Sequence, residues 1–251
     1  MLLVIASGFD TTAPPLVAGW AQHGAVLLTC QDLSVAGWQW HPGDPDRSTF
    51  VAGGQQIPVS ELRGVLTRLP AVFEQELQHI VAADRAYVAA EMTAFLRSWL
   101  ADLPCPVLNR PTPTGLSGPS WRTAHWVATA ARLGLTVEPV RRRTTAPGRL
   151  GSAPGDPQPA TPPEAAVAAG PITGTVVGGR CFGALPEAVK TQARCLADAA
   201  GVDLLGVHFL LAEEEARFAG ATLWPELNDP EVAEAVASYL CNAPASTRSH
   251  P

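Results

Sequence analysis

The polar residues best suited to bind a ligand stand directly after short apolar runs of the sequence. They are Asp10, Arg68, Asn109 and Arg110. Because the guanidinium group is a planar fork of donors, Arg68 and Arg110 are suited to a two-point contact with a carboxylate. Two plainer interpretations stay open at this stage: Asp10 caps the helix that follows it, and both arginines are ordinary surface charges.

An α/β fold has to position these residues. The apolar runs predict buried strands at 2–6, 25–29, 64–67 and 107–108, with a helix between the first two. Ligands of open α/β sheets bind outside the carboxyl ends of the strands. We therefore expect the residues that follow the first and the last of these strands to face one crevice.

The rest of the chain adds helices and a second group of strands. Trp121 and His125 share a face of one predicted helix and form the alternative binding surface, although packing at the rim of that helix also explains them. In chain order the remaining predicted elements are a hairpin at 49–59, helices at 74–100 and 119–132, a strand at 135–140, a hairpin at 173–184, a helix at 186–200, strands at 202–211 and 217–224, and a helix at 230–240.

Changes in composition divide the chain into domains. An α/β domain at 1–142 is followed by a stretch at 143–171 in which Pro, Gly, Ala, Ser and Thr dominate. We expect this stretch to be a flexible linker that is dispensable for folding. A second domain is predicted at 172–241, and a tail at 242–251.

Composition also excludes several classes of protein. Lys and Arg together number 17 and Asp and Glu 23, which gives a formal net charge of −6. Such an acidic balance is not typical of proteins that bind nucleic acid or anionic membranes. The five cysteines are scattered and form no CxxC pair, which favours a reduced, cytoplasmic setting over structural zinc or disulfides. The histidines show no metal-binding spacing, and the sequence contains no GxSxG, P-loop or GxGxxG motif.

The order of elements resembles the ATP-grasp ligases that modify ribosomal peptides, the microviridin type. The matching residues in the region 2–140 are the turn Asp10-Thr11-Thr12-Ala13, the strand end Leu66-Thr67-Arg68, the element Val107-Leu108-Asn109-Arg110-Pro111 and the stretch 130–137. The region 173–240, with Gly201-Val202-Asp203 leading to Phe209, is similar to the last part of an ATP-grasp fold. The resemblance implies a pre-ATP-grasp (Rossmann-like) N-terminal domain and a truncated ATP-grasp-like C-terminal part.

The family's metal ligands are the first place where this sequence departs from its pattern. The Asp that holds magnesium in the family is His208 here, and imidazole is a poor ligand for a hard cation. The family's Glu-x-Asn corresponds to Glu226 and Asn228 if the motif lies beyond Pro225. In the alternative register the stretch 222–224 occupies the motif and neither ligand is present. We prefer this second register because proline is disfavoured within strands.

The family's phosphate-binding lysines are the second departure. The subdomain that carries them would lie between the predicted strand at 135–140 and the hairpin at 173–184, where only the Pro-rich linker is found. Lys190, the single lysine of the chain, lies outside this interval. The three arginines at 141–143 are interpreted as a solvated segment.

The resemblance therefore implies a degenerate ATP-grasp-like protein that binds a peptide or a partner enzyme in peptide modification. In this interpretation it has lost ATP-dependent ligation and needs no cofactor. The alternative is a divergent ATP-dependent carboxylate–amine ligase of a ribosomal peptide, with ATP and with Mg²⁺ held by His208, Glu226 and Asn228. A third class is unrelated chemistry on the same scaffold. The residues leave open whether the protein is an enzyme and what its oligomeric state is.

Overall fold

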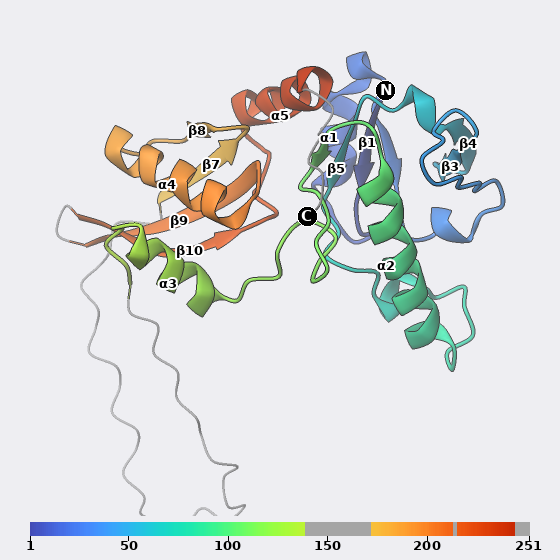
Figure 1. Ribbon diagram of the computed structural model, residues 1–251, viewed down its shortest axis with the longest axis horizontal. Coiled ribbons are helices and arrows are strands. Elements are labelled where there is room, and N and C mark those ends of the chain that lie inside the picture. The colour runs from blue at the N-terminus through green and yellow to red at the C-terminus, as the bar shows by residue number, and fades with distance from the viewer. Residues whose placement is uncertain (139–171, 213–214, 244–251) are drawn as a thin grey trace, which may run out of the picture.

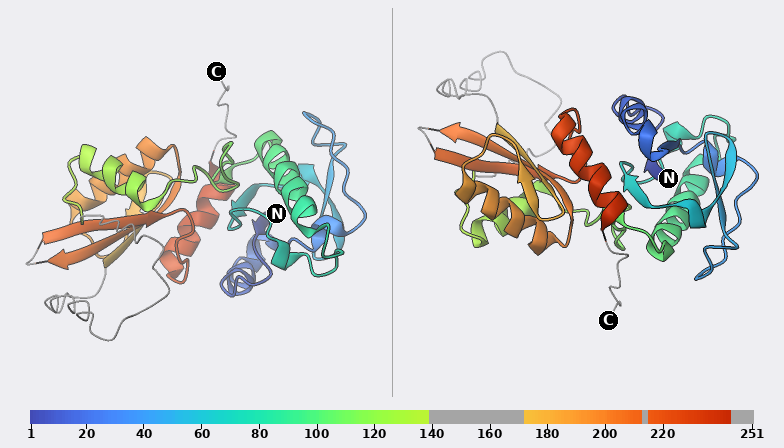
Figure 2. Two further views of the ribbon diagram at one scale, coloured as in Figure 1. Left: turned by 90° about the horizontal axis from the view of Figure 1, so that it is seen from below. Right: turned by 90° about the horizontal axis from the view of Figure 1, so that it is seen from above.

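The structure, a computed structural model, describes residues 1–138, 172–212 and 215–243 (Figure 1). The predicted linker and most of the predicted tail lie outside these residues. The described chain forms two lobes, each built on a four-stranded sheet, with helix α5 (Pro230–Asn242) between them (Figure 2).

The first lobe is built on a parallel sheet with the strand order β2-β1-β5-β6. Its strands are β1 (Leu2–Ile5), β2 (Val26–Leu28), β5 (Gly64–Thr67) and β6 (Val107–Leu108). Strands β1 and β5 are buried along their whole length, which explains why they appear in the sequence as continuous apolar runs. One face of the sheet is covered by α2 (Arg85–Asp102), and the other by α1 (Ala13–Gly19) and α5.

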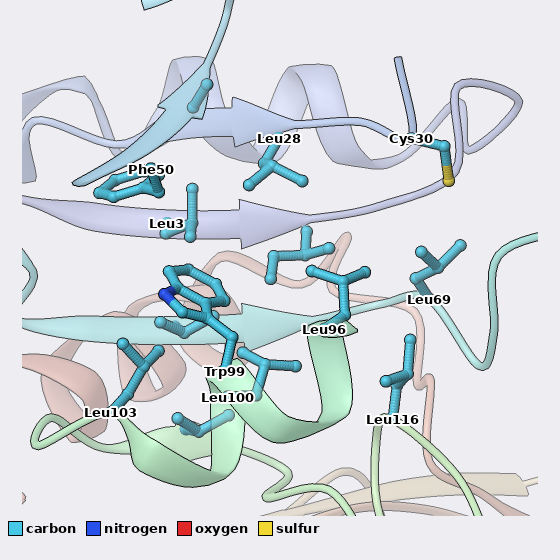
Figure 3. Packing of buried hydrophobic residues seen from close by; sticks show 14 of the residues in the cluster. Leu3, Leu28, Cys30, Phe50, Leu69, Leu96, Trp99, Leu100, Leu103 and Leu116 are labelled. Atoms are coloured by element: carbon cyan, nitrogen blue, oxygen red, sulfur yellow. The ribbon is translucent and has the colours of Figure 1, made fainter. Parts of the chain in front are cut away.

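The core under α2 is rich in aromatic side chains (Figure 3). Trp99 and Leu96 of α2 pack against Leu3 of the sheet and against Phe50 of the predicted hairpin. That hairpin is β3 (Thr49–Ala52) and β4 (Gln55–Pro58), joined through two glycines as expected. Buried side chains from a helix, the sheet and the hairpin thus fix the first lobe around one face of its sheet.

The predicted helix at 74–100 begins later than expected. The structure has a short 3-10 turn at Glu74–Glu76 and then irregular chain up to the start of α2 at Arg85. The apolar residues Leu77 and Ile80, which suggested a helical face, belong to this irregular segment and still pack into the core. Apolar spacing alone did not distinguish a packed loop from a helix, because both bury their apolar side chains.

The second lobe is an antiparallel sheet with the order β10-β9-β7-β8 and two helices on one face (Figure 1). The predicted hairpin, helix and two strands are all present, with ends shifted by a few residues. The elements are β7 (Ile172–Val177), β8 (Arg180–Phe182), α4 (Glu187–Ala200), β9 (Leu204–Ala212), β10 (Glu215–Thr222) and α3 (Thr123–Arg132).

Helix α3 packs with the second sheet although it precedes the linker in the sequence. Trp126 and Ala130 share a core with Phe209 and Phe218 of β9 and β10. The predicted strand that follows α3 is represented by one parallel bridge, from Val137 to Phe218, within the described residues. We propose that α3 belongs to the second lobe, and the domain boundary at 142 stays a prediction.

Helix α5 joins the two lobes. Its buried residues Val236 and Leu240 pack with Val4 of the first sheet and with Val177 and Phe182 of the second in one continuous core. The side chain of Asp229 accepts a hydrogen bond from the backbone N–H of Glu231 (2.8 Å), so Asp229 caps the N-terminus of this helix.

Candidate functional site

Two of the predicted site residues meet at the carboxyl ends of β1 and β5. The guanidinium Nε of Arg68 lies 2.8 Å from Oδ2 of Asp10, and both side chains are largely buried. Hydrogen-bonded pairing of this kind is what allows two charged groups to be withdrawn from water. The pair is the centre of the candidate site.

Asp10 orders the turn before α1 rather than capping the helix itself. Its Oδ1 accepts from the backbone N–H of Thr12 (2.8 Å) and from the Thr12 hydroxyl (2.6 Å), whereas the helix has no side-chain cap. Burial raises the pKa of Asp10, but the hydrogen bonds from Thr12 and Arg68 outweigh it and hold the pKa below its usual value.

Arg68 also reaches the second lobe. Its NH1 donates to the backbone carbonyl of Pro225 at 3.0 Å, in the segment between β10 and α5. Phe9, beside Asp10 in the sequence, is 70% exposed, and Trp224, beside Pro225, is 37% exposed. An accessible aromatic residue thus stands next in sequence to Asp10 in the first lobe and to Pro225 in the second.

Asn109 follows β6 as predicted, but it faces the second lobe. Its Nδ2 donates to the carbonyl of Leu204 (2.8 Å), and its Oδ1 accepts from the N–H groups of Asp203 (3.1 Å) and Leu204 (2.8 Å). The side chain is 3% exposed. Its amide is therefore engaged by the start of β9 and holds the two lobes together.

Arg110 lies at the end of α2 and not beside Arg68. Its two terminal nitrogens donate to backbone carbonyls that the helix leaves without partners. The acceptors are Leu100, Ala101, Leu103 and Cys105, at 2.9–3.5 Å. The structure therefore brings Asp10 and Arg68 together and directs the polar groups of Asn109 and Arg110 to other parts of the backbone.

The metal-ligand candidates do not form a compact donor set. His208 lies within β9, where its neighbours in register are Thr173 and Gly220. Strand β10 ends at Thr222, so Glu226 and Asn228 lie beyond the strand and are both exposed. The amide of Asn228 donates to the carboxylate of Glu226 at 3.0 Å.

These residues do not fit a magnesium nucleotide. Across the described parts of the chain no three His, Cys, Asp or Glu side chains are grouped so as to hold a metal ion. Magnesium requires oxygen ligands in a near-octahedral arrangement, and an imidazole does not supply one. Lys190 lies on α4 with its Nζ 4.0 Å from the carboxylate of Glu187, which is the setting of a surface helix residue.

Three cysteines have a raised thiol pKa, and none of these three is an activated nucleophile. Burial raises the pKa of Cys30 to about 12 and that of Cys105 to about 11. Burial also raises the pKa of Cys181. Since the thiolate is the reactive form, these three side chains are inert at neutral pH.

Two features at this end of the molecule escaped the sequence analysis. The Glu76 carboxylate accepts from the Ser7 hydroxyl and from the Gly8 N–H (3.0 Å), so it fills the turn after β1. A groove of about 440 Å³ also runs between α1 and α5. Neither was predictable from local pattern, because each depends on residues far apart in the sequence.

The aromatic cluster at the start of α3 is packed as a stack. Helix α3 begins at Thr123, so Trp121 lies before it and does not share a helix face with His125 as predicted. The rings of Trp121 and His125 lie 4.2 Å apart at an angle of 22°, and Trp121 also contacts Trp126 of the core. This arrangement matches the packing interpretation of the cluster.

Comparison with solved structures identifies the class of fold. The chain has the α/β fold of the ATP-grasp ligases, with a pre-ATP-grasp-like first lobe and an ATP-grasp-like second lobe, which confirms the fold expected from the sequence. No protein-family profile matches the chain, and no curated protein matches it either.

Particular structures share this fold over nearly the whole chain. The macrocyclase MdnC from Microcystis aeruginosa MRC, bound with precursor peptide MdnA, has a TM-score of 0.67 at 14% identity over 97% of this chain and 100% of its own. The ATP-grasp ligase PsnB, complexed with a minimal precursor, has a TM-score of 0.61 at 12% identity over 94% of this chain and 97% of its own. A Chryseobacterium gregarium ligase associated with ribosomal peptides, in complex with ADP and a leader and core peptide, has a TM-score of 0.59 at 10% identity over 96% of both chains.

The search for membrane-spanning helices gave a negative result. Within the described residues no helix combines the length and the apolar character needed to cross a bilayer.

Proposed function

We propose that this protein binds a peptide during peptide modification and does not ligate it with ATP. The peptide part is supported by the shared fold with MdnC, PsnB and the Chryseobacterium ligase, each of which is a complex with a precursor or leader peptide. The candidate contact is the Asp10–Arg68 pair, which lies where ligands of open α/β sheets bind. Phe9 and Trp224 beside it offer apolar surface to a peptide.

The non-ligating part is carried by one observation, the donor set at the metal position. His208 stands where the fold's ligases are expected to place a carboxylate, and Glu226 and Asn228 bind one another on the exposed segment after β10. Phosphoryl activation of a carboxylate needs Mg²⁺ and positive charge aligned on the phosphates. Lys190, already beside Glu187, does not supply that charge.

Calorimetric titration tests both parts. A peptide encoded beside this gene should bind, and Arg68→Ala should weaken this binding at least about tenfold, because the variant removes the guanidinium fork at the strand ends. The control is Arg97→Ala, which removes a half-buried arginine of α2 that donates a hydrogen bond to the carbonyl of Pro113. Mg·ATP should not bind tightly, and a dissociation constant of about 1 μM or below would overturn the non-ligating proposal.

A divergent ligase is the second candidate. It is favoured by the complexes of PsnB with Mg and ADP, which share the fold at TM-scores of 0.59 and 0.61. Incubation with the neighbouring peptide and Mg·ATP distinguishes the two candidates. Loss of water from the peptide, detected by mass spectrometry together with release of ADP, would establish ligation.

A further inference from the structure

A groove lies between α1 and α5, outside the Asp10–Arg68 pair. It has a volume of about 440 Å³, within the usual range of small-ligand sites. Figure 2 shows α5 lying beside α1 at the junction of the lobes. The groove is lined by Thr12, Pro15, Leu16, Gly19, Trp20, Leu227, Asn228, Pro230, Ala233 and Glu234.

The α5 side of the groove carries negative charge without counterions. Glu234 lines it, and Glu226, Asp229 and Glu231 lie on the exposed segment beside it. None of these carboxylates forms an ion pair with any cation in the described residues. Such a rim attracts a cationic ligand and repels an anionic one.

The floor of the groove is apolar. Leu16, Trp20 and Leu227 line it and belong to the buried core between the lobes. Trp20 is 2% exposed, and its indole N–H finds no acceptor in the part of the chain that the structure describes. An apolar floor beneath a carboxylate suits a long side chain with an apolar stem and a charged head.

We propose that this groove binds an arginine side chain of a peptide, with its guanidinium directed to Glu234 and its stem against the apolar floor. The fork of the guanidinium suits a carboxylate, and the backbone of a peptide supplies carbonyl acceptors. A divalent cation is a poorer occupant, because the described residues group no three metal-binding side chains here.

The groove is continuous with the Asp10–Arg68 site. Thr12 lines the groove and donates its hydroxyl to Asp10, and Asn228 lines it three residues after Pro225, the acceptor of Arg68. The same peptide therefore reaches both. The inference rests on the proposed function in taking the occupant to be that peptide, and it adds a requirement for a basic residue in its sequence.

An NMR titration with acetyl-Leu-Arg amide tests the groove separately from the strand-end site. The matched probe acetyl-Leu-citrulline amide has nearly the same shape and no charge. We expect the arginine probe to bind with a dissociation constant of about 1 mM and the citrulline probe at least about tenfold more weakly. Equal binding of the two probes, or no binding of either, would overturn the inference. Spermidine binding as tightly as the arginine probe would also overturn it, because a simple polyamine would then be the occupant.

Variants locate the binding within the groove. A Cβ on Gly19 would meet no atom within 4 Å, and Gly19 lines the groove, so Gly19→Leu blocks it without a clash. This variant should no longer bind the arginine probe, and its Tm should be unchanged. The control Ala18→Leu, at an exposed position of the same helix, should change neither the probe binding nor the Tm. Glu234→Gln should lower the affinity for the arginine probe about tenfold. Glu91→Gln, on the exposed surface of α2, should leave that affinity unchanged.

The outcomes also separate this inference from the proposed function. If Gly19→Leu binds the arginine probe as well as the wild type does, the probe binds outside the groove and the inference is wrong. If the neighbouring peptide binds while the arginine probe does not, the inference fails and the proposed function stands. If the probe binds and the neighbouring peptide does not, the proposed function fails instead.

Discussion

The end of β6 and the ends of β1 and β5 carry the same kinds of polar residue and use them differently. At the end of β6, Asn109 and Arg110 donate to backbone groups of β9 and α2. At the ends of β1 and β5, Asp10 and Arg68 pair with each other beside a groove. The difference lies in the surrounding backbone, because a helix end or a strand start without partners engages any donor or acceptor that can reach it. Both places engage backbone, since Arg68 also donates to the carbonyl of Pro225 and Asp10 accepts from the N–H of Thr12, but only the second place lies beside a groove.

The largest expected effect tests the structural side of this comparison. Asn109→Leu removes three hydrogen bonds and leaves the buried backbone groups of Asp203 and Leu204 without partners, so the free energy of unfolding should fall by about 2–4 kcal/mol. Urea unfolding measures it. The exposed Asn242→Ala, which loses one bond to Ser238, serves as the control and should cost under about 1 kcal/mol. If Asn109→Leu also lowers the free energy of unfolding by under about 1 kcal/mol, the hydrogen bonds of Asn109 to Asp203 and Leu204 do not hold the two lobes together.

The packing of α5 between the lobes gives the next effect. A Cβ on Gly64 would lie 2.6 Å from both Cβ and the carbonyl oxygen of Leu240, so Gly64→Ala forces α5 away from β5. We expect a loss of about 1–3 kcal/mol in the free energy of unfolding. Gly220→Ala, a strand position where the new Cβ meets nothing within 4 Å, should be close to neutral. Equal effects of the two changes would show that α5 is not closely packed on the first lobe.

The two arginines should separate stability from binding. Arg110→Ala removes the donors at the end of α2 and should lower the free energy of unfolding by about 1–2 kcal/mol while leaving peptide affinity unchanged. Arg68→Lys keeps a positive charge beside Asp10 but loses the fork that also reaches Pro225, so it should weaken the peptide. Thermal unfolding and calorimetry on both variants measure this. Weaker peptide binding by Arg110→Ala would show that Arg110 takes part in the peptide-binding site.

The smallest effect is a pH dependence confined to the charged pair. The folded-state pKa of Asp10 is lowered, so its interactions stabilise the fold above the pKa of about 3.9 that an Asp has when unfolded. This contribution is lost as the pH falls through the lowered folded-state pKa. Asp10→Asn should therefore be less stable than the wild type by about 1 kcal/mol at neutral pH and match it in strong acid. A constant difference across that range would show that the charge of Asp10 contributes nothing.

The sequence predicted most of the fold because its strands are short, continuous apolar runs separated by recognisable turns. The 3-10 turn at Glu74–Glu76 was missed, since apolar residues such as Leu77 are buried in a loop and a helix alike. Of the candidate site, the sequence placed Asp10 and Arg68 at strand ends, but it expected the ends of the first and the last strand to face one crevice and did not predict that Asp10 pairs with Arg68. The role of Arg110 was not predicted either, because it depends on where α2 ends in space. The groove could not be predicted, because α1 and α5 come from opposite ends of the chain.

The position of α5 has a consequence for synthesis on the ribosome. The second face of the first sheet is covered by α1 and by Val236 and Leu240 of α5, which are made more than 200 residues after Leu2 and Val4. Chains emerge from the ribosome N-terminus first, at about 5–20 residues per second. The side of the sheet that carries Leu2 and Val4 is therefore covered only in part, by α1, for about ten seconds or more until α5 is made. During that interval the nascent first lobe presents an apolar sheet face, which makes it a candidate client for chaperones that bind exposed apolar segments.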